Sequence, residues 1–281
     1  MTDRLLLGLI GDNIGASRAP LLHRLAGAQN GIEVRYDRLT PCALGLDFDA
    51  VFARCRDQGY RGINITYPYK ERVVAKLRIA DPLVRAIGAV NTVLFDPDGA
   101  TGHNTDHSGF IAAYRQGRGD RSPGVTLMIG AGGVGRAVAF GLAALGAPVL
   151  RLVDRDTAKA EALAEALRGA APQTKIELWP DAISAADGAE GLVNCTPVGM
   201  VGHDGTPLPR AAIDAPAWAF DAVYTPEHTR FLSDAAHAGA AILSGWELFF
   251  WQGVHAWNLF SGRPLDRDAL RAALRADQTA E

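Results

Sequence analysis

One lysine stands out as a residue that could move a proton. The chain has 28 basic residues, and the only lysines among them are Lys70, Lys76, Lys159 and Lys175. Lys70 ends the run Asn64–Lys70, in which a short apolar segment passes into a proline-marked turn. A lysine can lose its proton when desolvated, whereas an arginine stays charged. Because this chain otherwise uses arginine, Lys70 is better explained by acid–base chemistry than by a solvated surface charge.

A carboxylate also follows a strand-like segment, at Asp106 in the run Gly102–Asp106. Asp106 could simply cap the helix that comes after it. Alternatively it lies beside Lys70, where a carboxylate would hold the ammonium and set its proton affinity. Such a pair could pass a proton between a substrate hydroxyl and water. The residues alone leave both readings open.

A glycine-rich turn provides a second kind of chemistry. The pattern GxGxxG follows an apolar strand and opens an alanine-rich helix, which is the context that a dinucleotide-binding turn requires. Its glycines permit a tight turn, a close approach to pyrophosphate and close helix packing. The free N–H groups of the helix then face the phosphates. We expect cofactor contacts from Gly130, Ala131, Gly132, Gly133, Val134 and Gly135.

The residues after the next strand bear on which dinucleotide binds. Asp154 can accept hydrogen bonds from the adenine-ribose hydroxyls and repels a 2′-phosphate, which favours NAD. Arg155 and Lys159 point the other way, because either could pair with a 2′-phosphate. A carboxylate that faces the ribose should dominate. The sequence therefore predicts NAD, with NADP as the second choice.

The elements that position these residues alternate between strand and helix, which predicts an α/β fold with mostly parallel sheets. A first series has strands at Leu5–Ile10, Glu33–Leu39, Gly62–Thr66 and Ala89–Phe95, and helices at Pro20–Gln29, Phe48–Gln58 and His107–Gln116. After the turn-rich Gly117–Gly124, strands are expected at Val125–Ile129, Pro148–Val153, Gly191–Asn194 and Trp218–Val223. Helices are expected at Gly133–Leu145, Thr157–Leu167, Gly245–Phe260 and Arg267–Ala276. Two α/β domains are the simplest plan.

Composition narrows the function classes. The chain has 281 residues, 48% of them hydrophobic, and a net charge of −3. It lacks the basic surplus that nucleic acid binding needs, and no apolar stretch is long enough to span a membrane. Three cysteines without a CxxC pair indicate neither a disulfide framework nor a zinc site, and the histidines lack ligand spacing, so no metal is expected. We expect a cytoplasmic protein that acts on small molecules, as a monomer or homodimer.

Taken together, the motifs resemble those of the shikimate/quinate dehydrogenase family. They occur in the family's order: SRAP, NITYPYK, GAVNT, GHNTD, GAGGVG, NCTPVGM and DAVY. The resemblance implies an N-terminal α/β substrate domain of residues 1–106, completed by helices in 245–281, and a Rossmann-type NAD(P)-binding domain of residues 107–244. It implies an NAD(P)-dependent oxidoreductase that interconverts shikimate or quinate and its 3-dehydro ketone, as in aromatic amino acid biosynthesis.

The same resemblance assigns roles to individual residues. Lys70 and Asp106 would be the catalytic pair. Substrate contacts would come from Ser17 on the carboxylate, from Asn64, Thr66, Asn91 and Asp106 on the ring hydroxyls, and from Gln252 and Tyr224. The nicotinamide side of the cofactor would be flanked by Thr196, Pro197, Val223 and Gly245. Without the family, Gln252 and Tyr224 would be read as an exposed glutamine and a packing residue.

Two departures from the family pattern bear on specificity. The family usually has a second hydroxyl two residues after Ser17, and here that residue is Ala19. One hydrogen bond to a charged group is worth about 1.5–3 kcal/mol, so its loss weakens carboxylate binding about tenfold or more. Arg18 is not expected to compensate, because neighbouring residues of an extended segment face opposite ways. The usual Asn-Arg-Thr of NADP enzymes is replaced by Asp154-Arg155-Asp156, which resembles the NAD-using branch.

Several alternatives stay open. Ala19 leaves room for a related compound of the aminoshikimate type, or for a non-catalytic NAD-binding regulatory paralogue. A two-domain dehydrogenase of the methylene-tetrahydrofolate type also uses a lysine in its substrate domain. The run Asn104–Asp106 and Ser17 argue against that type, and the Lys70–Asp106 pair argues against a non-catalytic role.

Overall fold

The computed structural model describes residues 3–278. The chain forms two compact units, unit 1 of Met1–Thr105 with Gln252–Glu281 and unit 2 of Asp106–Trp251. The division falls at helix α5 (Thr105–Arg118) and within helix α10 (Gly245–Ser261). The boundaries predicted from the sequence, 106/107 and 244/245, lie in the first turn of α5 and just before α10. The predicted fold class, two α/β parts with mostly parallel sheets, is confirmed.

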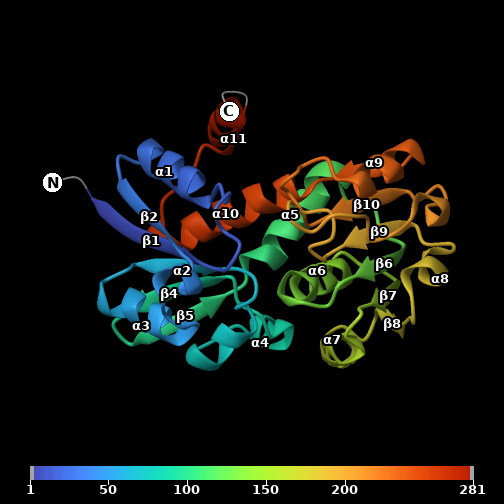
Figure 1. Ribbon diagram of the computed structural model, residues 1–281, viewed down its shortest axis with the longest axis horizontal. Helices are drawn as coiled ribbons and strands as arrows, with labels where there is room; N and C mark the ends of the chain where they lie inside the picture. Colours follow the sequence, from blue (N-terminus) through green and yellow to red (C-terminus); the bar gives the residue numbers. More distant parts are fainter. Residues whose placement is uncertain (1–2, 279–281) are drawn as a thin grey trace. The chain divides into compact units, whose positions relative to one another are not determined.

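Unit 1 is built on a five-stranded sheet (Figure 1). Its order is β2-β1-β3-β4-β5, in which β1, β2 and β3 are parallel while β4 is antiparallel to β3 and to β5. The strands are β1 (Arg4–Ile10), β2 (Glu33–Leu39), β3 (Gly62–Ile65), β4 (Thr92–Asp96) and β5 (Gly99–His103). The helices are α1 (Ala19–Gln29), α2 (Pro41–Leu44), α3 (Phe48–Asp57), the 3₁₀ helix η1 (Arg72–Lys76), α4 (Pro82–Ile87) and α11 (Arg267–Gln278).

Strand β3 shows how alternation along a strand places an amide on the face opposite an apolar core. Ile63 and Ile65 belong to the core that includes Phe48 and Phe52 of α3. Successive side chains of a strand face opposite sides, so Gly62 and Asn64 face the other way. A Cβ at Gly62 would lie 2.5 Å from the Phe260 ring of α10, and Asn64 lies among buried polar groups. The alternation therefore delivers one amide to the buried end of the central strand.

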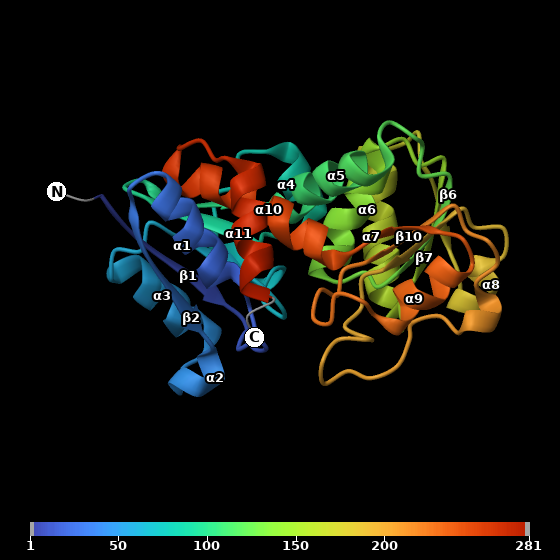
Figure 2. The ribbon, with the colours of Figure 1, turned by 90° about the horizontal axis from the view of Figure 1, so that it is seen from above.

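Unit 2 is built on a six-stranded, fully parallel sheet (Figure 2). Its order is β11-β10-β9-β6-β7-β8, the order of a doubly wound dinucleotide fold. The strands are β6 (Val125–Ile129), β7 (Val149–Val153), β8 (Lys175–Leu178), β9 (Gly191–Asn194), β10 (Trp218–Asp221) and β11 (Ala241–Leu243). Besides α5 and α10, the helices are α6 (Gly133–Ala144), α7 (Thr157–Ala170), α8 (Ala182–Ala186), the 3₁₀ helix η2 (Arg210–Ala212) and α9 (Arg230–His237).

The turn-rich segment Gly117–Gly124 lies within unit 2, between α5 and β6, and does not separate the two units. Helix α5 belongs to unit 2 because its aromatic residues pack there. The Phe110 and Phe220 rings meet edge-on at 5.1 Å, as do those of Tyr114 and Trp218. The composition break at Gly117–Gly124 therefore marks a loop and not a domain boundary, because helix α5 before it packs into the core of unit 2.

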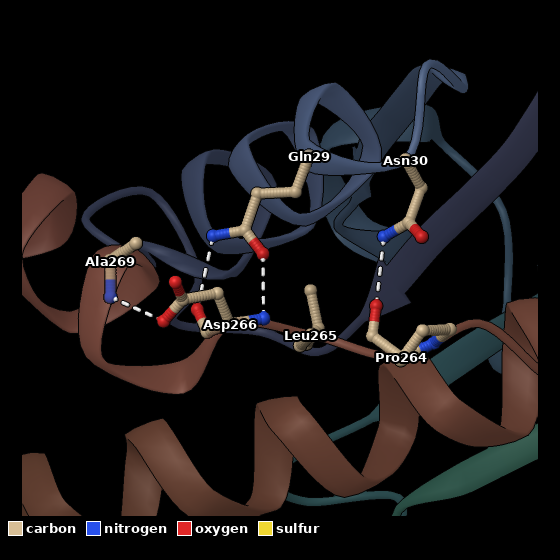
Figure 3. Close-up of a pocket in the computed structure, with 6 residues that line it drawn as sticks. All are labelled: Gln29, Asn30, Pro264, Leu265, Asp266 and Ala269. Carbon is tan, nitrogen blue, oxygen red and sulfur yellow. Dashed lines mark hydrogen bonds between the residues drawn. The ribbon is translucent and has the colours of Figure 1, made fainter.

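The C-terminal helices of unit 1 are fixed to α1 by paired hydrogen bonds (Figure 3). The Gln29 amide donates to the Asp266 carbonyl at 3.1 Å and accepts from the Asp266 N–H at 3.0 Å. Asn30 donates to the Pro264 carbonyl at 3.0 Å. The pocket lined by these residues thus lies where the segment after α10 is hydrogen-bonded to the end of α1.

Candidate active site

The proposed catalytic lysine follows β3 in a turn. Lys70 is half-buried, and its carbonyl accepts a hydrogen bond from the Val90 N–H at 2.8 Å. Lys70 lies in the turn before the short η1, which begins at Arg72. Strand β4 starts at Thr92 and not at the predicted Ala89, and the Val90 N–H bonds to the turn at Lys70 instead of to a neighbouring strand.

The Asn64 side chain is buried at the end of β3, and its hydrogen-bonding groups are engaged within unit 1. Its Nδ2 donates to the Asn91 carbonyl at 3.2 Å and to Thr92 Oγ1 at 3.1 Å. Its Oδ1 accepts from the Tyr36 hydroxyl at 2.9 Å. An amide has two donor positions and two lone pairs, so at most one lone pair is left for a substrate hydroxyl.

His23 packs against the Tyr36 ring, whose hydroxyl binds Asn64. It is 1% exposed and stacks on the Tyr36 ring, with the centroids 5.0 Å apart. Burial lowers the pKa of His23 to about 3, and a side-chain hydrogen bond with Asn64 opposes this only in part. His23 is therefore a neutral imidazole at physiological pH. Together, Tyr36 and His23 fix the orientation of the Asn64 amide.

Asn91 hydrogen-bonds to Thr105 and to Gln252, and both Asn91 and Gln252 are predicted substrate contacts. Its Oδ1 accepts from the Thr105 N–H at 2.7 Å, and its Nδ2 donates to Thr105 Oγ1 at 2.9 Å. The same Nδ2 reaches Gln252 Oε1 at 3.5 Å. Gln252 is half-buried on α10, so the glutamine that only the family suggested does lie beside Asn91. Thr66, also half-buried, continues β3 through an N–H bond to the Ile10 carbonyl.

The predicted carboxylate-binding turn precedes α1. Ser17 is 9% exposed, and its Oγ accepts from the Ala19 N–H at 3.3 Å, which leaves the Ser17 hydroxyl proton available for a ligand. Arg18 donates to Asp277 at 2.8 Å and to the Leu274 carbonyl at 2.9 Å on α11. As expected, Arg18 does not replace the hydroxyl missing at Ala19. Arg38 of β2 donates to the Ser17 carbonyl at 2.6 Å and fixes the turn.

Asp106 is the second residue of α5 and is buried. It therefore lies inside the first turn and not at the cap position, where Asn104 precedes the helix. A carboxylate in the first turn is favoured by the helix dipole. Lys70 belongs to unit 1 and Asp106 to unit 2, so the pairing of the two residues stays a prediction.

The glycine-rich turn of unit 2 has the geometry that a pyrophosphate needs. Gly130 has a φ of +103°, and a Cβ at Gly135 would lie 2.1 Å from the Gly130 carbonyl oxygen, so both positions require glycine. A Cβ at Gly132 would meet no atom within 4 Å, so open space adjoins the backbone there. Helix α6 begins at Gly133 with its free N–H groups. These residues fit a dinucleotide phosphate group.

Asp154 follows β7 and ties the glycine-rich turn to the next strand. Its Oδ2 accepts from the Ala131 N–H at 2.6 Å and its Oδ1 from the Asp156 N–H at 2.8 Å. Each oxygen keeps a lone pair for a ribose hydroxyl. Arg155 is exposed, and Asp156 caps α7 through its bond to the Lys159 N–H. The carboxylate is thus fixed at the turn, while the arginine extends into solvent.

Two loops carry the residues predicted for the nicotinamide side. After β9, the Asn194 Oδ1 accepts from the Thr196 N–H at 3.0 Å and from its hydroxyl at 2.7 Å, while Pro197 is exposed. After β10, Val223 is 4% exposed, and the Tyr224 ring stacks on Phe249 of α10 at 5.0 Å. Gly245, the first residue of α10, is buried.

Over residues 3–278, no group of three or more His, Cys, Asp and Glu side chains is arranged to hold a metal ion. In the same range, no helix has the length and hydropathy of a membrane-spanning segment.

Some residues around the site were not singled out from the sequence. Tyr36 is on the buried phase of β2, and His23 is on the face of α1 that packs against it, but both look like ordinary core positions in the sequence. Thr92 and Asp221 lie inside the quoted motifs GAVNT and DAVY without an assigned role. A polar residue at the buried phase of a strand end is the signal that could have identified them.

The chain is similar to known dehydrogenases both in sequence and in structure. Residues 9–93 match the family model described as the shikimate dehydrogenase substrate binding domain. The chain is 38% identical over 279 residues to a quinate/shikimate dehydrogenase (NAD(+)) of Corynebacterium efficiens, which covers 96% of this chain and 97% of that protein. It is 38% identical over 272 residues to a shikimate dehydrogenase (NADP(+)) of Streptomyces avermitilis, covering 94% and 92%. The structure of quinate dehydrogenase from Corynebacterium glutamicum in complex with NAD has a TM-score of 0.88 and 35% identity, covering 98% of this chain and 99% of that one.

Proposed function

The chain belongs to the shikimate/quinate dehydrogenase family of NAD(P)-dependent oxidoreductases, and we propose from this premise that it interconverts shikimate or quinate and the 3-dehydro ketone. The observation that carries the proposal is the network in unit 1 that joins buried Asn91 and Thr105 to half-buried Gln252. These are neutral amides and hydroxyls, which suit the hydroxyl groups of a cyclic polyol better than a charged or apolar ligand.

Unit 1 takes the substrate in this proposal. Ser17 donates its hydroxyl proton to the substrate carboxylate. Asn91, Gln252 and Thr66 hold ring hydroxyls, while Asn64 acts through the Asn91 carbonyl and Thr92 that it binds. Tyr224 of unit 2 lines the site. Each contact orients the ring, and orientation of reactants is a main source of rate enhancement.

Lys70 and Asp106 move the proton. During oxidation, the Lys70 amine takes the hydroxyl proton as the carbinol carbon loses its hydride, and during reduction the ammonium returns it. Asp106 holds the lysine and stabilises its charged form. A bound nicotinamide supplies or takes the hydride.

Unit 2 binds the dinucleotide, and we propose NAD. The turn Gly130–Gly135 and the start of α6 hold the pyrophosphate, and Asp154 holds the adenine ribose and repels a 2′-phosphate. Thr196, Pro197, Val223 and Gly245 hold the nicotinamide side. Arg155 would favour NADP only if its attraction for a 2′-phosphate outweighed the repulsion by Asp154. Two backbone N–H groups fix the Asp154 carboxylate in place.

Ala19 supports a second candidate substrate. It is 8% exposed and lacks the hydroxyl that the family usually has at this position. A substrate that places a different group near Ala19, such as an aminoshikimate-type compound, would not need that hydroxyl.

We further propose a cytoplasmic protein, as a monomer or homodimer, which cell fractionation and light scattering would test.

The test measures nicotinamide reduction with shikimate and with quinate, each with NAD and with NADP. Turnover with NAD supports the proposal, and the better acid reveals how Ala19 shapes the pocket. Turnover with NADP alone would overturn the argument from Asp154. Tight nucleotide binding without turnover in all four mixtures, and with an aminoshikimate-type compound, would favour a non-catalytic paralogue.

A further inference from the structure

Asp221 is a buried carboxylate that the proposed mechanism does not use. Asp221 is the last residue of β10 and is fully buried, with 0% of its surface exposed. In the sheet it pairs with Asn194, the last residue of β9. Strands β9 and β10 are neighbours in the sheet of unit 2 (Figure 1). A buried carboxylate is costly unless hydrogen bonds compensate for its lost hydration, so its partners are informative.

Three hydrogen bonds reach this carboxylate, and they divide between its oxygens. Oδ1 accepts from Asn194 Nδ2 at 2.9 Å and from the Val223 N–H at 3.0 Å. Oδ2 accepts from the Thr229 hydroxyl at 2.7 Å. Oδ1 therefore joins the loop after β9 to the loop after β10, while Oδ2 faces the start of α9.

The two loops that Oδ1 joins carry residues proposed for the nicotinamide side. Asn194 passes the constraint on, because its Oδ1 holds both the N–H and the hydroxyl of Thr196 and its Nδ2 also reaches the Val198 carbonyl at 3.1 Å. On the other loop, the Val223 N–H is bonded directly. The adenine side has a separate contact, in which Asp154 Oδ2 accepts from the Ala131 N–H of the glycine-rich turn.

Among residues 3–278, the hydrogen-bond partners of the Asp221 carboxylate carry no charge. Burial raises its pKa to about 6, and the hydrogen bonds from Thr229, Val223 and Asn194 lower it only in part. These three partners are neutral. The carboxylate therefore costs stability at neutral pH, which is easier to explain if it serves the site than if it serves only the core.

We propose that Asp221 is a positioning residue for the nicotinamide half of the cofactor site, which it shapes by tying Asn194 to Val223 through Oδ1. This inference rests on the proposed function, because it requires a nicotinamide nucleotide to bind unit 2. It predicts that loss of Oδ1 weakens binding of the nicotinamide end selectively, and that loss of the Oδ2 contact does not.

The experiment compares the dissociation constants of NAD and ADP-ribose by calorimetry, using the full chain. Asp221→Ala should weaken NAD about tenfold, as expected when the buried Asn194 amide and the Val223 N–H lose their acceptor, and leave ADP-ribose unchanged. Asp221→Asn keeps an acceptor at Oδ1 and should restore most of the NAD affinity. Asn194→Ala cuts the same link from the other strand and provides the test if Asp221→Ala does not fold.

Thr229→Val is the matched control. It removes the Oδ2 contact and the N-cap bond to the Leu232 N–H, so it should lower the unfolding temperature without changing NAD affinity. Equal weakening of NAD and ADP-ribose by Asp221→Ala, or an equal NAD loss in Thr229→Val, would overturn the proposal. Unchanged NAD binding in Asp221→Ala would overturn it while leaving the proposed function intact. A parent chain that binds no nicotinamide nucleotide would overturn both.

Discussion

His23 in unit 1 and Asp221 in unit 2 are both buried behind residues proposed for the site, yet acid acts on them in opposite directions. Each hydrogen-bonds an asparagine at the end of a central strand, His23 to Asn64 and Asp221 to Asn194. Burial lowers the pKa of His23 to about 3 and raises that of Asp221 to about 6. Both shifts have the same cause, since burial penalises whichever form is charged.

The difference shows what each half of the site requires. In unit 1 the asparagine is held by groups that stay neutral throughout the physiological range, so a polyol would meet fixed amides and hydroxyls. In unit 2 the asparagine is held by a carboxylate, a strong acceptor that can bond two donors with one oxygen. The first arrangement favours stability, and the second sacrifices some stability for a tightly held pair of loops.

The largest effect should come from Lys70→Ala, which separates the roles of the two units. We expect kcat to fall by about 10²–10⁴-fold, the usual contribution of a positioned acid–base group. The dissociation constant of NAD should not change, because its proposed contacts are in unit 2. Steady-state kinetics with calorimetry checks both quantities.

The matched control for Lys70 is Lys76→Ala, which removes a lysine paired with Asp49 at 3.0 Å. It should keep the parent kcat. If Lys70→Ala turned over as fast as the parent with substrate and cofactor bound, the catalytic assignment would be wrong. If it instead lost NAD affinity, the division of roles between the units would be wrong.

The second effect is the acid sensitivity that His23 brings to unit 1. Its pKa is lower in the folded chain than the ordinary 6.5, so stability is complete above pH 6.5 and is lost as pH falls towards 3. From pH 7 to 5 the loss should be about 2 kcal/mol, at 1.36 kcal/mol per unit below 6.5. Urea unfolding should find that His23→Phe lacks this loss, whereas His237→Gln, at an exposed histidine, retains it.

Strands and helices could be predicted from the sequence where the hydrophobic pattern is clear. Strands β2, β6 and β9 have the predicted bounds, because each is a run with clear alternation or an apolar run between turn residues. Edge strands β8 and β11 and the short helix α4 were missed. They are short, they are held by a neighbouring strand or by a cap such as Asp81, and three to six residues show no reliable period.

The residues of the candidate site also differ in whether local sequence could identify them. The glycine-rich turn and Lys70 could be found from residue types, since a turn and a lysine among arginines are local signals. Gln252 needed the family, because it comes to Asn91 from the far end of the chain. Tyr36, His23 and Asp221 were overlooked because their roles depend on which buried amide they meet, and local sequence does not specify that.

The third effect should have the opposite sign to that of His23. The pKa of Asp221 is higher in the folded chain than the ordinary 3.8, so its contribution to stability is complete below pH 3.8 and is lost as pH rises through about 6. From pH 7 to 5 the parent should therefore gain about 1.4 kcal/mol from this group. Asp221→Asn should lack that gain in urea unfolding. An Asp221→Asn variant with the parent's pH dependence would remove the contrast between the units.

The smallest effect should come from Tyr36→Phe, which removes one neutral bond from the Asn64 amide and leaves the stacked ring. Such a bond contributes about 1 kcal/mol, so the unfolding free energy should fall by that amount. The KM for shikimate should rise while the KM for NAD stays the same, since Asn64 acts within unit 1. Tyr60→Phe is the control, because it removes a hydroxyl that binds Asp37 at 2.6 Å elsewhere in the same unit and should leave both constants unchanged. A rise in both constants with Tyr36→Phe would mean that Asn64 is not a local support of the substrate residues, and the contrast with Asn194 would fail.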